Sequence, residues 1–147
     1  MSTFRDRRHL STLLEGELGF YRRLFMLIDR QRDRLQSDPE RQLVEDFEAI
    51  REMRKRIEAS EDLVAQIRSD QEQAFDDWAR TPEIIDLQEK IAKLVAECHQ
   101  AAVDCGRLVQ DRLAAYRVEL ADMDKGRRLL ASFTFAGEGP RYVDKRP

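Results

Sequence analysis

The sequence predicts an all-α fold: an elongated antiparallel three-helix bundle or coiled coil with a long third helix and a flexible C-terminal tail. Apolar residues recur at steps of three and four along most of the chain, which places them on one face of a helix. Within residues 1–133 only Pro39 and Pro82 interrupt this pattern, each after a suitable N-cap residue, Asp38 or Thr81. We therefore expect a bundle over residues 1–133, with helices near 2–36, 39–79 and 82–131, and a flexible docking tail over 134–147.

The first expected helix carries one apolar stripe with a single polar interruption. Arg32 stands at the position where the next apolar residue is due. The two glycines in this helix are tolerated at a cost of about 1 kcal/mol each relative to alanine. The stripe consists of Leu10, Leu14, Leu18, Tyr21, Phe25, Ile28 and Leu35.

The second expected helix is the acidic one, and we expect it to run unbroken from Pro39 to Ala79. Its middle, residues 51–62, supplies few apolar side chains and contains a basic run. Acidic residues interleave with that run at helical spacing, which indicates a solvated helix surface rather than a nucleic-acid patch. The net charge of −3 likewise disfavours a nucleic-acid partner. The apolar stripe consists of Leu43, Phe47, Ile50, Ile57, Val64, Ile67, Phe75 and Trp78.

The third expected helix is the longest, at roughly 75 Å against roughly 50 to 60 Å for the others. Because short breaks join the three helices, the surplus length belongs to the third, and its last turns have fewer neighbours to pack against. An exposed apolar edge of this kind marks a binding surface or an oligomer contact. The alternative is that the helix bends or breaks near Gly126 and folds back. The edge consists of Leu113, Tyr116, Leu120, Met123, Leu129, Leu130 and Phe133.

No residue pattern for catalysis, metal binding or cofactor binding is found, so we expect neither an enzyme nor a cofactor. His9 and His99 lack the Glu-x-x-His spacing of di-iron bundles. Cys98 and Cys105 would have Cα atoms roughly 10 Å apart on one helix, too far for a disulfide, so free core thiols are expected. The N-terminal residues lack the apolar core of a signal peptide, and no segment has the length of a membrane span. We expect a cytoplasmic protein.

Several segments resemble the FlgN family of flagellar type III export chaperones. Residues 13–24, LLEGELGFYRRL, lead into LIDRQ at 27–31, and this is similar to the leucine pair, glutamate, aromatic and second leucine pair that open the family's pattern. Residues 105–109, CGRLV, through Leu120 look like the family's third helix, and GPRYVDKR at 139–146 resembles its basic tail. Where the family often has asparagine and a tail tyrosine, this chain has Cys105 and Phe135.

The resemblance implies a cytoplasmic chaperone that binds the C-terminal helices of hook-associated (hook–filament junction) proteins, prevents their premature assembly and delivers them to the export gate. No nucleic acid or membrane insertion is expected, and a homodimer is left open. Two alternatives also stay open: a chaperone for the filament cap or filament subunit, and a structural coiled-coil or dimerisation protein with no client. Our hypothesis assigns client binding to Leu113, Tyr116, Leu120, Met123 and Leu130, and docking on the client or the export gate to Phe133, Phe135 and Tyr142.

Overall fold

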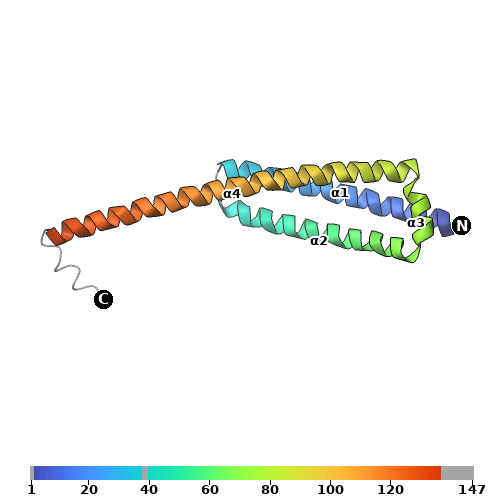
Figure 1. Cartoon of the computed structure of the whole chain (residues 1–147), viewed down its shortest axis with the longest axis horizontal. Helices are drawn as coiled ribbons and strands as arrows, with labels where there is room; N and C mark the ends of the chain where they lie inside the picture. Colours follow the sequence, from blue (N-terminus) through green and yellow to red (C-terminus); the bar gives the residue numbers. More distant parts are fainter. Residues whose placement is uncertain (1, 38–39, 137–147) are drawn as a thin grey trace. The chain divides into compact units, whose positions relative to one another are not determined.

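A computed structural model describes residues 2–37 and 40–136, and every element in these ranges is a helix (Figure 1). The side chains are described for residues 7–37 and 42–133. The helices are α1 (Ser2–Ser37), α2 (Glu40–Asp70), α3 (Glu72–Ala79) and α4 (Pro82–Ala136). They pack against one another, so the predicted all-α bundle is confirmed. Asp38 and Pro39, the predicted break between the first two helices, lie outside the described residues.

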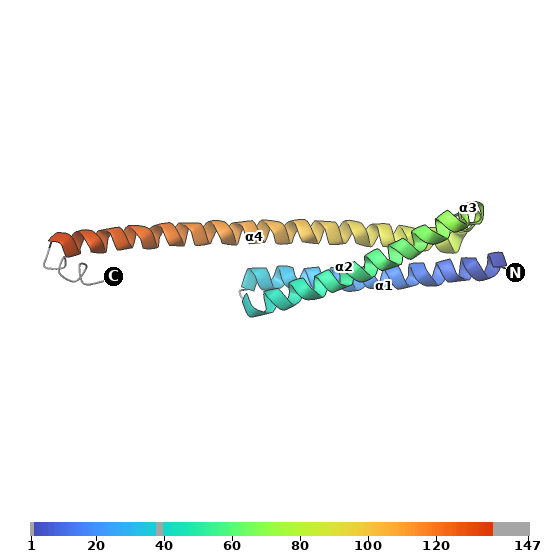
Figure 2. The same ribbon diagram turned by 90° about the horizontal axis from the view of Figure 1, so that it is seen from below.

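The chain forms two compact units, Met1–Leu108 and Val109–Pro147. The first unit holds α1, α2, α3 and the first half of α4, and α3 lies at the end of this unit where α2 gives way to α4 (Figure 2). The second unit holds the remainder of α4. In the part of the chain that the structure describes, no helix is long and apolar enough to cross a membrane.

The predicted second helix, 39–79, is wrong as one continuous element, because it divides at Gln71 into α2 and α3. Gln71 has φ −136° and ψ 54°, outside the helical region. Neither glycine nor proline is present at this break. Residues 68–73 are all polar, so the apolar stripe has a step of eight residues from Ile67 to Phe75. The separate direction of α3 allows Phe75 and Trp78 to be buried, each with only 3% of its surface exposed.

The predicted start of the last helix at Pro82 is confirmed. Thr81 donates from its hydroxyl to the Trp78 carbonyl at 2.7 Å, and its N–H donates to the same carbonyl at 3.0 Å. These bonds satisfy a backbone acceptor at the end of α3 that the helix itself leaves unpaired. The sequence suggests Thr81 as the N-cap of α4. In the structure its side chain instead bonds to the end of α3.

The core of the first unit is a cluster to which all four helices contribute. Large-to-small changes at such positions cost several kcal/mol, since the burial of the side chain is lost and a cavity remains. Partly buried side chains of α2 and α4, such as Val64 and Ile91, pack against the cluster. Its buried members are Leu10, Leu14, Leu18, Phe75, Trp78, Ile84 and Leu87.

The predicted inequality in helix length is confirmed: α4 has 55 residues, against 36 in α1 and 31 in α2. It continues without a break through Gly126, which rules out the alternative of a helix that ends there and folds back. It also runs to Ala136, five residues past the predicted end at 131. The first three residues of the predicted tail, 134–136, thus belong to the helix, while 137–147 lie outside the described residues.

Candidate functional site

The second unit presents a row of exposed apolar side chains along α4, which we call the α4 stripe. Its members follow one another at steps of three and four, with one step of seven, so they share a face of the helix. They are between 42% and 68% exposed, and the row is roughly 26 Å long at 1.5 Å per residue. The α4 stripe consists of the five residues predicted to bind a client, Leu113, Tyr116, Leu120, Met123 and Leu130.

Several apolar side chains of α4 in the first unit are covered by the other helices. Ile84 and Leu87 of α4 are 0% and 7% exposed in the core cluster. In contrast, none of the described side chains at 109–133 is buried. Exposed apolar residues are ordinary when they are scattered singly, whereas a contiguous row marks an interaction surface. The α4 stripe is such a row.

The structure places one of the three predicted docking residues beside the stripe. Phe133 is 75% exposed and follows Leu130 by three residues, which makes the two neighbours on the helix surface. Phe135 belongs to α4, but its side chain lies outside the described part of the chain. Tyr142 lies outside the described residues altogether. The hypothesis that these three aromatic residues dock on the client or the export gate stays a prediction.

Sequence reasoning missed the charged residues that border the α4 stripe. Arg112 and Glu119 each precede a stripe residue, whereas Arg117 and Asp124 each follow one, so the two pairs lie on opposite borders. Asp124 also makes an ion pair with Arg128 at 3.2 Å, one turn along the helix. The signal was available in the sequence, because a heptad assignment of residues 109–130 identifies these border positions directly.

Two other concave surfaces lie in the first unit. A cavity of about 500 Å³ on α2 has an apolar lining of Phe47 and Ile50 and a charged lining of Arg51, Arg54, Lys55 and Glu58. A smaller one, about 250 Å³, is lined by α1, α2 and α4 residues, among them Tyr21, Glu61 and Cys98. Four of the six residues that line the larger cavity are charged, whereas a typical small-molecule site is mostly apolar, and the smaller cavity lies below the usual size of such a site, about 300 to 1,000 Å³. The α4 stripe therefore remains the stronger candidate.

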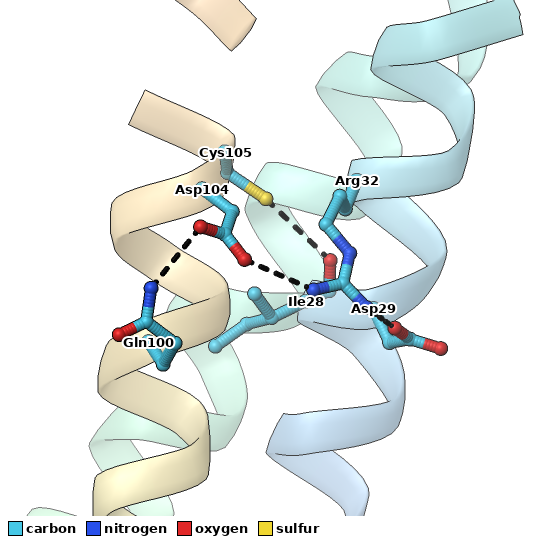
Figure 3. A network of polar contacts seen from close by, with 6 residues as sticks. All are labelled: Ile28, Asp29, Arg32, Gln100, Asp104 and Cys105. Carbon is cyan, nitrogen blue, oxygen red and sulfur yellow. Dashed lines mark hydrogen bonds and ion pairs between the residues drawn. The ribbon is translucent and has the colours of Figure 1, made fainter. Parts of the chain in front are cut away.

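A polar network links α4 to α1 within the first unit (Figure 3). Arg32 donates to Asp104 of α4 at 3.2 Å and also pairs with Asp29 on its own helix. Gln100 donates to the other oxygen of Asp104 at 3.2 Å. The one polar residue in the α1 stripe thus meets a carboxylate in place of an apolar neighbour. This network positions the first half of α4 on the bundle.

The two cysteines are free and buried, as predicted. The Cys98 thiol donates to the Tyr21 carbonyl at 3.7 Å, and the Cys105 thiol to the Ile28 carbonyl at 3.6 Å. Burial raises the pKa of both thiols. Since the thiolate is the reactive form, these side chains are weak nucleophiles at neutral pH and act as small core residues.

A buried carboxyl group lies at the contact between α1 and α2. Glu17 is 6% exposed, and burial, together with the nearby charge of Glu61, raises its pKa from 4.5 to about 7. Tyr21 donates from its hydroxyl to Glu61 at 2.6 Å, and burial and this bond raise the pKa of the phenol as well. The cluster joins α1 to α2, and the raised pKa of a carboxyl in the folded state predicts that the stability of the first unit depends on pH.

Within the described ranges, no group of three or more His, Cys, Asp or Glu side chains is arranged to hold a metal ion. Comparison of the chain with protein families, with curated proteins and with solved structures finds no match. The likeness to the FlgN family therefore rests on the residues quoted above, and the site rests on its own geometry.

Proposed function

We propose that this chain is a helix-binding chaperone of the flagellar export type, whose α4 stripe holds the C-terminal helices of hook-associated proteins until they are delivered to the export gate. One observation carries the proposal: a row of five large apolar side chains, each at least 42% exposed, on a helix whose first half buries comparable residues. A surface of this kind is stabilised when another apolar surface covers it.

The spacing of the stripe favours a helix as the partner. Steps of three and four are the pattern with which two helices interlock their side chains at a shallow crossing angle. A strand or a loop would not repeat with that period. A partner helix of five or six turns would run along the whole stripe, and an interface of standard size would bury roughly 800 Å² on each side.

The identity of the client follows from the resemblance to the FlgN family, whose clients are hook-associated proteins in the cytoplasm. The filament cap and the filament subunit are the alternative clients, and binding assays with each protein separate the three. The exposed stripe also suits a second alternative, a structural protein that dimerises through this surface and has no client. That alternative predicts a tight dimer that survives dilution in sedimentation experiments.

The test compares two substitutions on α4 that differ in the face they alter. Leu120→Arg introduces a charge in the middle of the stripe. Val118→Arg is the matched control, because Val118 is 61% exposed against 64% for Leu120 and lies about 200° away around the helix. Binding of each variant to the C-terminal helices of a hook-associated protein is measured by calorimetry.

We expect Leu120→Arg to weaken binding by about a hundredfold or more, because a guanidinium would be buried without a partner, and Val118→Arg to leave it unchanged. Equal affinity of the two variants would show that the stripe is not the binding surface.

A further inference from the structure

We propose that the partner helix carries its charges in two blocks of opposite sign, and that the order of these blocks sets the direction in which it lies on the α4 stripe. This inference rests on the proposed function, since it concerns the same surface. The apolar side chains of the stripe favour a helix as the partner. The charges beside them determine which helix fits and in which direction it lies.

The heptad register of the second unit identifies which charges a partner meets. Residues 109, 113, 116, 120, 123, 127 and 130 are separated alternately by four and three residues and occupy the two core positions of the repeat. Arg112 and Glu119 each come directly before a residue at one core position, Leu113 or Leu120, and so lie on one border of the stripe. Arg117 and Asp124 each come directly after a residue at the other core position, and they lie on the opposite border. In coiled coils these border positions decide which partners pair and in which direction.

The four border charges are sorted along the helix axis. On each border an arginine, Arg112 or Arg117, is followed one heptad later by an acid, Glu119 or Asp124. Each border therefore changes from positive to negative over roughly 10 Å of helix. Three of the four side chains, at 117, 119 and 124, are exposed, and Arg112 is half-buried. A partner helix is complementary when it is acidic beside the arginines and basic beside the acids.

The same arrangement disfavours a second copy of this chain in parallel register. In a parallel pair, a residue on the border of Arg112 and Glu119 faces a residue on the other border of the second helix. The facing residue has a sequence number that is higher by five. Arg112 would then face Arg117 of the second copy, and Glu119 would face Asp124. All of these contacts join like charges, and each is destabilising. A helix of different sequence avoids this repulsion in either direction, whereas a second copy avoids it only when antiparallel, because Arg112 then faces Glu119 and Arg117 faces Asp124.

Arg127 adds a marker of register, because it occupies a core position between Met123 and Leu130. Its aliphatic stem can pack against a neighbouring helix, while its guanidinium needs an acceptor. A partner that presents a carboxylate opposite Arg127 satisfies this need, whereas a fully apolar partner core leaves the charge without a hydrogen-bond partner. A single acidic residue in an otherwise apolar partner stripe is thus part of the expected chemistry.

Three synthetic helical peptides test the proposal on the full-length chain. All share one apolar stripe with a glutamate near each end, placed so that one of the two meets Arg127 in either direction. The first has an acidic N-terminal half and a basic C-terminal half, the second has the reverse order, and the third has glutamine at every border position. Each carries a benzophenone at its N-terminus, and mass spectrometry locates the photocrosslink on the protein.

We expect the first peptide to lie parallel to α4, with crosslinks near residues 109–113, and the second to lie antiparallel, with crosslinks near 127–133. The glutamine peptide should crosslink at both ends and bind about tenfold more weakly, since several ion pairs of the exposed kind are lost. In the charge-reversed variant R112E/R117E/E119R/D124R the two crosslinking sites should exchange.

The outcomes separate this inference from the function on which it rests. If no peptide binds, the stripe is not a helix-binding surface and the proposed function fails. If the two charged peptides bind but crosslink at the same place, the orientation inference is overturned while the proposed function stands. The comparison on the wild-type chain decides between these results even if the charge-reversed variant does not fold.

Discussion

Tyr21 of α1 donates a 2.6 Å hydrogen bond to Glu61 of α2, and one turn away from Tyr21 on α1 lies the buried carboxyl of Glu17. Two acidic side chains thus meet at the α1–α2 interface, and the tyrosine hydroxyl bonds to only one of them. Burial, together with the nearby charge of Glu61, disfavours the ionised form of the Glu17 carboxyl, and this raises its pKa to about 7.

The first prediction concerns pH. A carboxyl whose pKa is raised on folding binds more protons in the folded state than in the unfolded state, so stability falls as pH rises from 4.5 to about 7. The Glu17→Gln variant has no carboxyl at this position, so this loss of stability with rising pH is removed. At pH 8 the variant should be more stable than the wild type by on the order of 2–3 kcal/mol, and at pH 4.5 the two should be nearly equal.

The measurement is urea unfolding of both proteins at a series of pH values. Glu15→Gln, an exposed change two residues away on α1, is the matched control and should show no such pH-dependent difference. A stability difference between Glu17→Gln and wild type that stays constant from pH 4.5 to 8 would contradict the account of this cluster.

The second prediction concerns Asp46 of α2, which is 1% exposed and accepts a 2.5 Å hydrogen bond from Arg34. Arg30 lies further from the same oxygen, at 3.5 Å, and its side chain is 53% exposed. Among the partners that the structure describes, Arg34→Ala leaves the buried carboxylate with this longer ion pair alone, so we expect a loss of about 2–4 kcal/mol in the free energy of unfolding.

Arg30→Ala is the matched control and should cost less than about 1 kcal/mol, as expected for a solvent-exposed ion pair. Chemical denaturation of the two single variants gives both values. Should the two losses be equal, Arg34 would not be the main partner of the buried carboxylate.

The third prediction separates residues that hold the fold from residues that serve the site. Trp78 is 3% exposed in the core cluster, whereas Leu130 of the α4 stripe is 68% exposed. Trp78→Ala should lower the free energy of unfolding by about 3–5 kcal/mol, and Leu130→Ala should change it by no more than about 0.5 kcal/mol. Thermal and urea unfolding measure both. A large loss of stability in Leu130→Ala would mean that the stripe is covered in solution.

The sequence contained enough information for the all-α bundle and for the start of α4. Pro82 marks that start because proline is tolerated only in the first turn of a helix, and the apolar period identifies the buried face of α1. The break at Gln71 could not be predicted in the same way. No glycine or proline stands there, and the reason for it is the burial of Phe75 and Trp78 against Leu10 and Leu14, more than 55 residues away in sequence.

The candidate site shows the same division between local and long-range causes. The spacing of Leu113, Tyr116 and Leu120 is a local property, so the stripe could be predicted from the sequence. The partner of Arg32 could not, because Asp104 is 72 residues distant and only the packing of α4 on α1 brings the two together. Exposure of the stripe likewise depends on what the rest of the chain covers, which only the structure describes.

The central claim is that the apolar face of α4 in the second unit binds a helix of another protein. Hydrogen exchange of residues 109–133, with and without the C-terminal helices of a hook-associated protein, tests it most directly. We predict that amides of this segment become strongly protected in the complex, while those of the core cluster change little. Unchanged exchange at 109–133 in a chain that demonstrably binds the client would contradict the claim.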